Sequence, residues 1–283
     1  MIEIFGGCRN GRFRQPPVAK GKEAMWRKLF LLSLGEALPA QGKPCDADAE
    51  VLAQMLAKLD RERLQKVNRI KSPVKKLESA GGGLLLQFAL QEALDAERKQ
   101  TECAEEASAE AASACSLTIS ELLNAVAFPL PLEYTYKGAG KPYFKDYPYY
   151  FSLSHSGDYV LCAISDEEIG ADIQEMKPCD AERIAARFFT EEEKEKLGKC
   201  REEGEKLDCF YEIWSCKEAY GKMTGEGVGK ALGVNISQSV GRHTGQPDGP
   251  LVRQLPAPEG YKIAVCVKSR QKSFQNGDER KRV

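Results

Sequence analysis

The sequence predicts an α+β fold, in which helices and strands occupy separate stretches of the chain. The clearest strand pattern lies over residues 149–173, where three short apolar runs are separated by turns. Helices are expected from about Asp46 and again after Pro178, and strands return at 234–237 and 262–267. This grouping favours α+β over a doubly wound parallel sheet, which would alternate strands and helices.

Length and composition are those of a globular protein. The chain has 283 residues, of which 42% are hydrophobic and 29% charged, and its net charge of −1 gives no reason to expect nucleic acid or a membrane as partner. Ten cysteines form no C-x-x-C pair, and two histidines are too few for a Cys/His zinc site. No apolar run of about 18 residues occurs, and the N-terminus lacks an apolar signal core. We therefore expect reduced thiols in the cytoplasm.

In the first half, a weak strand pattern at 2–5 precedes a helix whose apolar residues share one face. These residues are Val51, Leu52, Met55, Leu56 and Leu59. A basic stretch at 61–71 then leads to Gly81–Gly83 and an apolar run. Residues 95–116, rich in Ala, Glu and Ser, either extend the preceding helix or form a mobile insert, and composition leaves both open.

In the second half, residues 139–150 are expected to be a loop because Gly and Pro punctuate them. Three strands follow, at 149–154, 159–165 and 169–173. Helices are expected after Pro178, from Thr190, and over about 206–223. Thr190 and Glu193 have the spacing of a capping box. The charged tail from Ser269 is expected to be disordered.

Asp172 and Gln174 are candidate metal ligands at the end of the third strand. Residues two apart face the same side of a strand, so both would present an oxygen together. Such hard ligands suit Mg²⁺, which takes few carboxylates and keeps places for water and phosphate. Taken alone, an acidic residue here is more often a solvated edge residue.

Trp214, Glu218 and Lys222 lie four apart on a predicted helix and share a face. They are either a core tryptophan beside an exposed Glu–Lys ion pair, or Glu218 is a metal ligand and Lys222 binds a phosphate.

Ser154 and His155 stand where a strand ends in a tight turn. Neighbouring side chains on a strand point oppositely, so they are not a nucleophile and its base, but they could hold a phosphate.

Two glycine-rich stretches are rejected as phosphate-binding loops. Around residues 225–230, Thr224 stands where a P-loop has its first glycine, and Ala231 stands where it has its final Ser or Thr. Gly81–Gly83 is followed by leucine rather than lysine. Close helix packing is the expected use of both stretches.

Five blocks occur in a fixed order: GKPYF at 140–144, FSLSHSGDYVLCAIS at 151–165, IGADIQ at 169–174, RFFTEEE at 187–193 and WSCKEAYGKMTGEG at 214–227. Together they resemble the 4′-phosphopantetheinyl transferases of the broad-specificity, Sfp-type class. The resemblance is strong over about 138–230 and looser back to the basic stretch near 61–86.

The resemblance implies a metal centre. Asp172 matches the family's first metal carboxylate, and Glu218 matches a metal ligand and proposed general base. Gln174 stands where the family often has glutamate, and its amide oxygen would be a third ligand or leave that place to water. The catalytic set implied is Glu218, Lys222 and Asp172, with Mg²⁺ or Mn²⁺ as the cofactor.

The resemblance also implies a site for coenzyme A. Lys222 matches a lysine on the pyrophosphate, and Lys141 one near the adenine. Ser154 and His155 match residues that hold the 3′-phosphate and neighbouring groups. The basic residues Arg63 and Lys66 fall where the family places cations against the 3′-phosphate, whereas Glu78 stands near where some members carry a basic residue.

The activity implied is transfer of 4′-phosphopantetheine from coenzyme A to a serine of an apo acyl, peptidyl or aryl carrier protein, with release of 3′,5′-ADP. Glu218 would take the serine proton directly or through a metal-bound water. Fatty acid, polyketide and nonribosomal peptide carriers all remain open. A Mg²⁺-dependent phosphoester or nucleotide hydrolase is the alternative, since the same residues could activate water.

The fold implied is a monomer of two similar α+β halves with coenzyme A in the cleft between them. The halves would be 1–137, with the Ala/Glu-rich insert at about 95–116, and 138–268, with the metal and coenzyme A motifs. The tail is 269–283. For the carrier, Arg183 and Arg187 on the helix after Pro178 either dock its acidic surface or are merely solvated.

Overall fold

The structure is a computed structural model that describes residues 27–38, 48–102, 114–126, 129–231, 233–236 and 250–268. The strand expected at 2–5 and the tail expected to be disordered from Ser269 lie outside these residues. The fold is α+β, as the sequence predicts. Within the described part, no helix is both long enough and apolar enough to cross a bilayer.

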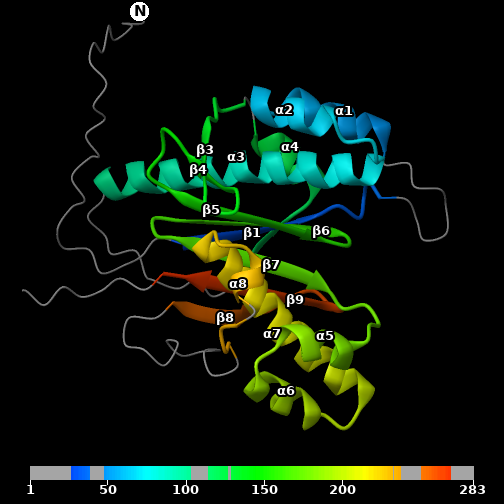
Figure 1. The fold of residues 1–283 in the computed structure, drawn as a ribbon. Coiled ribbons are helices and arrows are strands. Elements are labelled where there is room, and N and C mark those ends of the chain that lie inside the picture. Colours follow the sequence, from blue (N-terminus) through cyan, green and yellow to red (C-terminus); the bar gives the residue numbers. More distant parts are fainter. Residues whose placement is uncertain are drawn as a thin grey trace, which may run out of the picture.

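Two β-sheets lie face to face, and each carries helices on its outer side (Figure 1). The first sheet has the strand order β2-β1-β6-β5 and the second β7-β9-β8. The strands of the first sheet are β1 (Arg27–Ser33), β2 (Cys115–Leu117), β5 (Tyr150–Ser156) and β6 (Tyr159–Ser165). Those of the second are β7 (Ile169–Glu175), β8 (Leu251–Leu255) and β9 (Tyr261–Val267).

Four helices lie on the outer side of the first sheet, where α3 packs on the strands and the other three pack on α3, and four accompany the second sheet (Figure 1). The first group is α1 (Ala49–Ala57), α2 (Arg61–Asn68), α3 (Pro73–Glu102) and α4 (Ile119–Ala125). The second group is α5 (Ala181–Phe188), α6 (Glu191–Gly198), α7 (Glu203–Thr224) and α8 (Val228–Ala231). A separate hairpin joins β3 (Tyr134–Lys137) to β4 (Lys141–Phe144).

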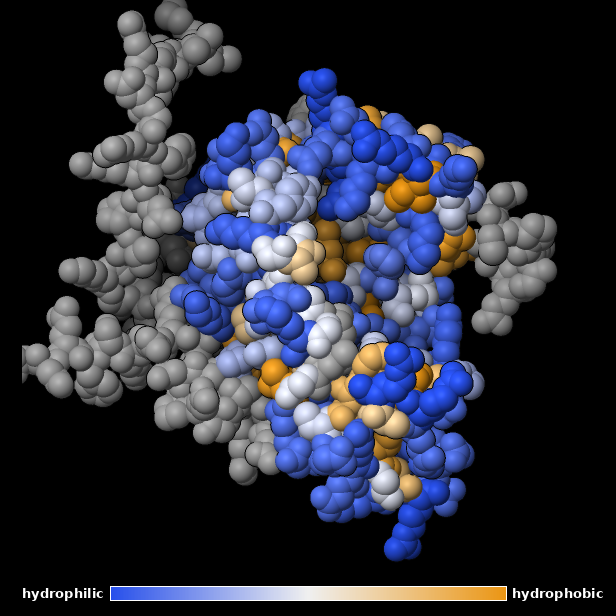
Figure 2. All heavy atoms as spheres, in the orientation of Figure 1, coloured by the Kyte–Doolittle hydropathy of each residue, from blue (hydrophilic) through white to orange (hydrophobic). Residues whose placement is uncertain are grey.

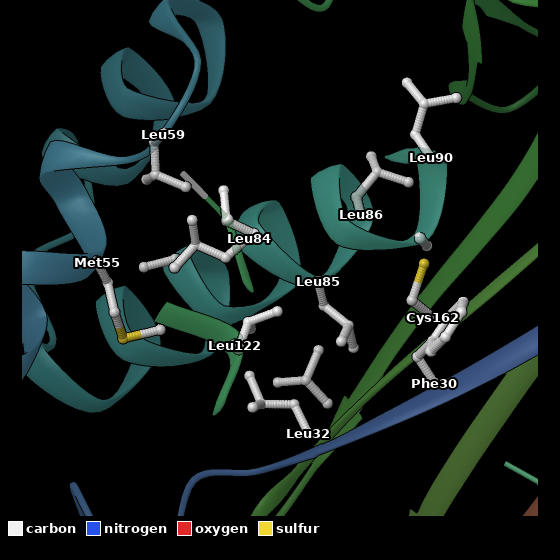
Figure 3. Packing of buried hydrophobic residues seen from close by; sticks show 14 of the residues in the cluster. Phe30, Leu32, Met55, Leu59, Leu84, Leu85, Leu86, Leu90, Leu122 and Cys162 are labelled. Atoms are coloured by element: carbon white, nitrogen blue, oxygen red, sulfur yellow. The ribbon is translucent and has the colours of Figure 1, made fainter. Parts of the chain in front are cut away.

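The strands separate these layers because alternate residues point to opposite faces. On β6, Val160 and Cys162 pack with the helices of the first group, whereas Leu161 and Ala163 pack between the two sheets. Figure 3 shows the helix side of this arrangement, where Leu84, Leu85 and Leu86 of α3 lie among side chains from β1, α1 and α4. The middle of the long helix α3 is thus the centre of the first core.

The strand cluster at 149–173 is confirmed as β5, β6 and β7, and the predicted helices are confirmed as α1 and α5–α7. The predicted apolar face of α1 points toward the core, since Met55 is buried, as is Leu59 just beyond the helix. The capping box is also confirmed, since Thr190 Oγ1 accepts from the Glu193 amide and the Glu193 carboxylate accepts from the Thr190 amide.

Other predictions were wrong. The expected loop at 139–150 contains β4, whose residues pair with β3. Residues 234–236 of the strand expected at 234–237 are not in a strand. Four strands, β1, β2, β3 and β8, had no clear pattern in the sequence. Helix α3 continues to Glu102, so the helical alternative holds for the start of the 95–116 stretch.

The first sheet joins segments from both sides of the expected boundary at 137/138. Strand β1 pairs antiparallel with β6 along its whole length and parallel with β2, while β6 also pairs with β5. The second sheet is built entirely from residues after 168.

Glycine at position 170 lets β7 lie directly on α7. A Cβ atom at Gly170 would stand 2.0 Å from the Ala219 carbonyl oxygen and 2.3 Å from the Met223 nitrogen. These are backbone atoms, which cannot move aside like a flexible side chain. The contact fixes how far β7 lies from the face of α7 that carries Glu218 and Lys222.

We predict that Gly170→Ala lowers the free energy of unfolding by about 1–3 kcal/mol or more, because the added methyl group overlaps the α7 backbone. Denaturant unfolding followed by circular dichroism measures the change. Gly204→Ala is the matched control: it lies in the first turn of α7 with open space around the new methyl group, so it should be neutral or slightly stabilising. Equal stability of the two variants would contradict the account.

Candidate functional site

A cavity of about 630 Å³ opens between helices α2 and α3, strand β5 and the C-terminal part of α7. Its lining includes seven of the residues that the sequence analysis selected: Arg63, Lys66, Lys141, Ser154, His155, Glu218 and Lys222. Asp172 lies just beneath this lining and accepts hydrogen bonds from Ser154 and Lys222. The structure therefore brings the predicted residues to one place.

The Asp172 carboxylate is the centre of a buried hydrogen-bond cluster. Its Oδ1 accepts from Ser154 Oγ at 2.7 Å and from Lys222 Nζ at 2.6 Å. Its Oδ2 accepts from Gln174 Nε2 at 2.8 Å. Asp172 is 1% exposed, so these three donors stabilise a carboxylate that water cannot reach.

Glu218 lies one turn before Lys222 on α7 and also faces the cavity. Burial, together with the nearby charge of Asp172, raises the pKa of Glu218 from 4.5 to about 6, although Lys222 acts in the opposite direction. Within the described part of the chain no hydrogen bond to the Glu218 carboxylate occurs. Two carboxylates and one lysine thus share this wall of the cavity.

This donor set fits a hard divalent cation. Mg²⁺ is commonly held by one or two carboxylates, and the repulsion between Asp172 and Glu218 is the kind that a bound cation relieves. Gln174 presents its amide nitrogen, not its oxygen, to Asp172 and so orients that carboxylate. Among the described residues no group of three or more His, Cys, Asp and Glu side chains has a geometry that could hold a metal ion, and Asp172 and Glu218 are two.

A fully buried ion pair fixes helix α7 behind the site. Lys217 Nζ lies 2.8 Å from Glu193 Oε2, and both side chains are 0% exposed. Lys217 also donates to the Val234 carbonyl, and Glu193 accepts from the Ile236 amide. Lys217 therefore points away from the cavity and anchors the helix, while the next residue, Glu218, points into it.

Lys141 reaches the cavity with its aliphatic part, but its ammonium group is bound by protein. Nζ donates to the Glu168 carboxylate and to the carbonyl oxygens of Ile169 and Met223. Burial lowers its pKa, an effect that Glu168 opposes. In this arrangement Lys141 ties the β3–β4 hairpin to the start of β7 and the end of α7, and it has no donor left for a ligand.

Helices α2 and α3 supply the opposite wall. Gly83 lets α2 approach α3 closely, because a Cβ atom there would lie 2.7 Å from Cγ of Arg63. Burial lowers the pKa of Lys66, and the charge of Arg63 adds to this. The expectation that the glycines serve helix packing is confirmed at this position.

Two further residues of α3 enter the cavity. Lys75 and Glu78 form an ion pair of 2.7 Å, and Glu78 Oε2 lies 3.3 Å from His155 Nδ1. Burial lowers the pKa of His155 below its usual 6.5, while Glu78 opposes the shift. Lys75 could not be singled out from the sequence, since nothing in its spacing separates it from the lysines of the basic stretch at 61–71.

Part of the chain matches a known family of enzymes. Residues 168–266 match the family model of the 4′-phosphopantetheinyl transferase superfamily, which confirms the resemblance found in the motifs. The match includes β7 and α7, the two elements that carry Asp172, Glu218 and Lys222.

Individual relatives support the same class. A 4′-phosphopantetheinyl transferase of Bacillus subtilis is 34% identical over 146 residues, and psf-1 of Bacillus pumilus is 36% identical over 152 residues. These alignments cover 49% and 50% of this chain and 64% of each relative. HetI of a Nostoc species is 36% identical over 115 residues, which is 38% of this chain and 48% of the relative. The chain thus matches these relatives over less than two thirds of their length.

In metal-free buffer we predict that the Glu218 carboxyl titrates near pH 6 and that Asp172→Asn lowers its pKa, because a like charge is removed while Lys222 remains. Carbon-13 NMR of the carboxyl signals measures both values. A carboxyl with a raised pKa holds its proton better in the folded state, so its ionisation costs stability as pH rises from 4.5 through 6. The Asn variant should lose part of this pH dependence. An unchanged pKa in the variant would contradict the proposed proximity of the two carboxylates.

Proposed function

We propose that this protein transfers the 4′-phosphopantetheine group of coenzyme A to a serine hydroxyl of an apo carrier protein and releases 3′,5′-ADP. The observation that carries the proposal is the cluster of Asp172, Ser154 and Lys222 beside Glu218, at the wall of a cavity lined by cations. The names of the relatives above, all 4′-phosphopantetheinyl transferases, support it.

The charges of the cavity suit a polyphosphate ligand. Lys222, Arg63 and Lys66 all line the cavity. Lys222 would bind the pyrophosphate, and Arg63 and Lys66 of α2 would bind the phosphate at the nucleotide end. His155 would add a ring N–H donor for the ligand, whereas the one proton of Ser154 is already donated to Asp172. Phosphoryl transfer depends mainly on positioning and on neutralising charge, and these residues supply both.

Asp172 and Glu218 would hold the divalent cation, which when bound supplies positive charge to the pyrophosphate oxygens as the phosphorus–oxygen bond breaks. Lys222 would neutralise the same oxygens after exchanging part of its contact with Asp172 for a contact with the ligand. Gln174 would keep the Asp172 carboxylate in place through its amide nitrogen.

Glu218 is the candidate proton acceptor. Its carboxylate faces the cavity, and its pKa of about 6 is that of the metal-free protein, which a bound cation would lower. The nucleophile is the serine of the carrier, so no serine of this chain needs to react. Ser154 donates to Asp172 and accepts from the Ile173 amide and Lys222, which suits a role in positioning these groups.

A phosphoester hydrolase with the same residues gains no support, because the relatives named above are transferases.

The carrier would approach near α5, where apolar side chains gather among hydrophilic ones (Figure 2). Ile184 and Phe188 of α5 pack against the core of α7 and are only partly covered. Arg183 is 82% exposed at its side chain, and Arg187 lies over the Phe188 ring.

Transfer should require Mg²⁺ or Mn²⁺ and stop in EDTA. Asp172→Asn should abolish it, and Glu218→Gln should lower kcat by about 10²–10⁴-fold, the usual effect of losing a general base. Carrier modification followed by intact-protein mass spectrometry measures each rate. Asp208→Asn, which breaks an ion pair with Lys262 outside the cavity, is the control and should retain wild-type activity. Full turnover without a divalent metal would overturn the metal assignment.

Charge reversal at Arg183 and Arg187 should slow carrier modification at low salt while leaving the affinity for coenzyme A unchanged, because acidic carriers would lose an attractive surface. The defect should shrink as ionic strength rises, since exposed charges are screened. Initial rates at several salt concentrations, with calorimetric titration of coenzyme A, measure both effects. Wild-type rates at low salt with a panel of carriers would show that α5 is not the docking surface.

A further inference from the structure

A second cavity, of about 470 Å³, opens between helix α6 and the first half of α7, and the proposed function does not use it. Cys200, just after α6, and Cys209, on α7, both line it. Within the described part of the chain, the two cavities have no lining residue in common. The other residues that line the second cavity are Lys196, Gly204, Glu205, Asp208 and Glu212.

The two thiols of this cavity are in contact. Cys209 is 7% exposed, and the partly exposed Cys200 packs against the same apolar cluster. Burial raises the pKa of Cys209 to about 12, and the charge and hydrogen bond of Cys200 add to this shift, whereas the Lys196 ammonium opposes it. Cys200 Sγ also donates to the Lys196 carbonyl oxygen at 3.8 Å, which keeps it at the end of α6. Because both cysteines are free and their side chains already meet, little movement is needed to join them.

The other described cysteines lack this combination of contact and access. Cys162, Cys216 and Cys266 are 0% exposed, so a dissolved oxidant does not reach them in the folded protein. Cys115 and Cys179 are exposed, but neither shares a cavity or an apolar cluster with a second cysteine of the described part. The pair in the second cavity is therefore the place where an oxidant meets one thiol with another beside it.

We propose that Cys200 and Cys209 form a redox modification site, at which a small disulfide such as oxidised glutathione joins their two sulfur atoms. The thiolate of Cys200 attacks one sulfur of the oxidant, forms a mixed disulfide and releases one thiol. Cys209 then attacks Sγ of Cys200 and releases the second thiol. The protein loses two hydrogen atoms, with their electrons, and the oxidant becomes two thiols. The new bond joins the end of α6 to α7.

The second of these steps decides which product accumulates. The raised pKa of Cys209 leaves little thiolate and slows its attack. Contact with Cys200 offsets this, because a group held in place acts at an effective concentration far above that of a dissolved thiol. The internal disulfide should therefore exceed the mixed disulfide once equilibrium is reached.

The test equilibrates the folded, full-length protein with mixtures of reduced and oxidised glutathione, blocks the remaining thiols by alkylation and maps the products by peptide mass spectrometry. The wild type should carry a Cys200–Cys209 linkage in about tenfold or greater excess over glutathione bound to Cys200. Cys209→Ala should carry glutathione on Cys200 instead, because the second step is lost. Cys179→Ala is the matched control: it removes an exposed thiol outside this cavity and should form the linkage as the wild type does.

Both products are measured in one wild-type sample, so the result does not depend on whether a variant folds. Glutathione that stays on Cys200 of the wild type without a linkage to Cys209 would overturn the inference. A Cys200 that stays reduced in excess oxidised glutathione would also overturn it. None of these measurements involves coenzyme A or a carrier, so the inference stands or falls separately from the proposed function.

Discussion

Strand β7 lies against helix α7 at Gly170, where even one methyl group would overlap the carbonyl of Ala219. This close contact brings Asp172 within 2.6 Å of Lys222 and sets Glu218 beside them. The Lys217–Glu193 pair holds α7 from behind, so the position of the helix is fixed on two sides. Removing either constraint would leave the same side chains on the same elements but separate the groups that must act together.

The cavity is completed by the other layer of the molecule. Helix α3 packs on the first sheet and α2 packs on α3, which brings Arg63, Lys66 and Glu78 to the same cavity as Ser154 and His155 of β5. The two sheets share one apolar interface. This interface holds the cavity wall that carries Arg63 and Lys66 at a fixed distance from the wall that carries Asp172 and Glu218. The site thus depends on packing between layers as much as on any single motif.

Strands with a clear apolar pattern and helix starts with a capping pattern could be predicted, because neighbouring residues in the sequence determine them. Asp172, Glu218 and Lys222 could be selected from spacing and resemblance, and β5–β7 from their apolar runs. Strand β1 could not, since its short apolar run does not alternate with polar residues and its partner β6 is more than a hundred residues away. The commitment of Lys141 to Glu168, and of Glu78 to Lys75, depends on distances that a sequence does not contain.

The central claim is that the Asp172–Glu218 wall directs phosphopantetheine to a carrier serine rather than to water. The most direct measurement incubates the full chain with coenzyme A, Mg²⁺ and an apo carrier, and quantifies holo-carrier and 3′,5′-ADP in the same reaction. The account predicts equal amounts of the two products and almost no 3′,5′-ADP when the carrier, or its serine, is absent. Release of 3′,5′-ADP at the same rate without a carrier would contradict it.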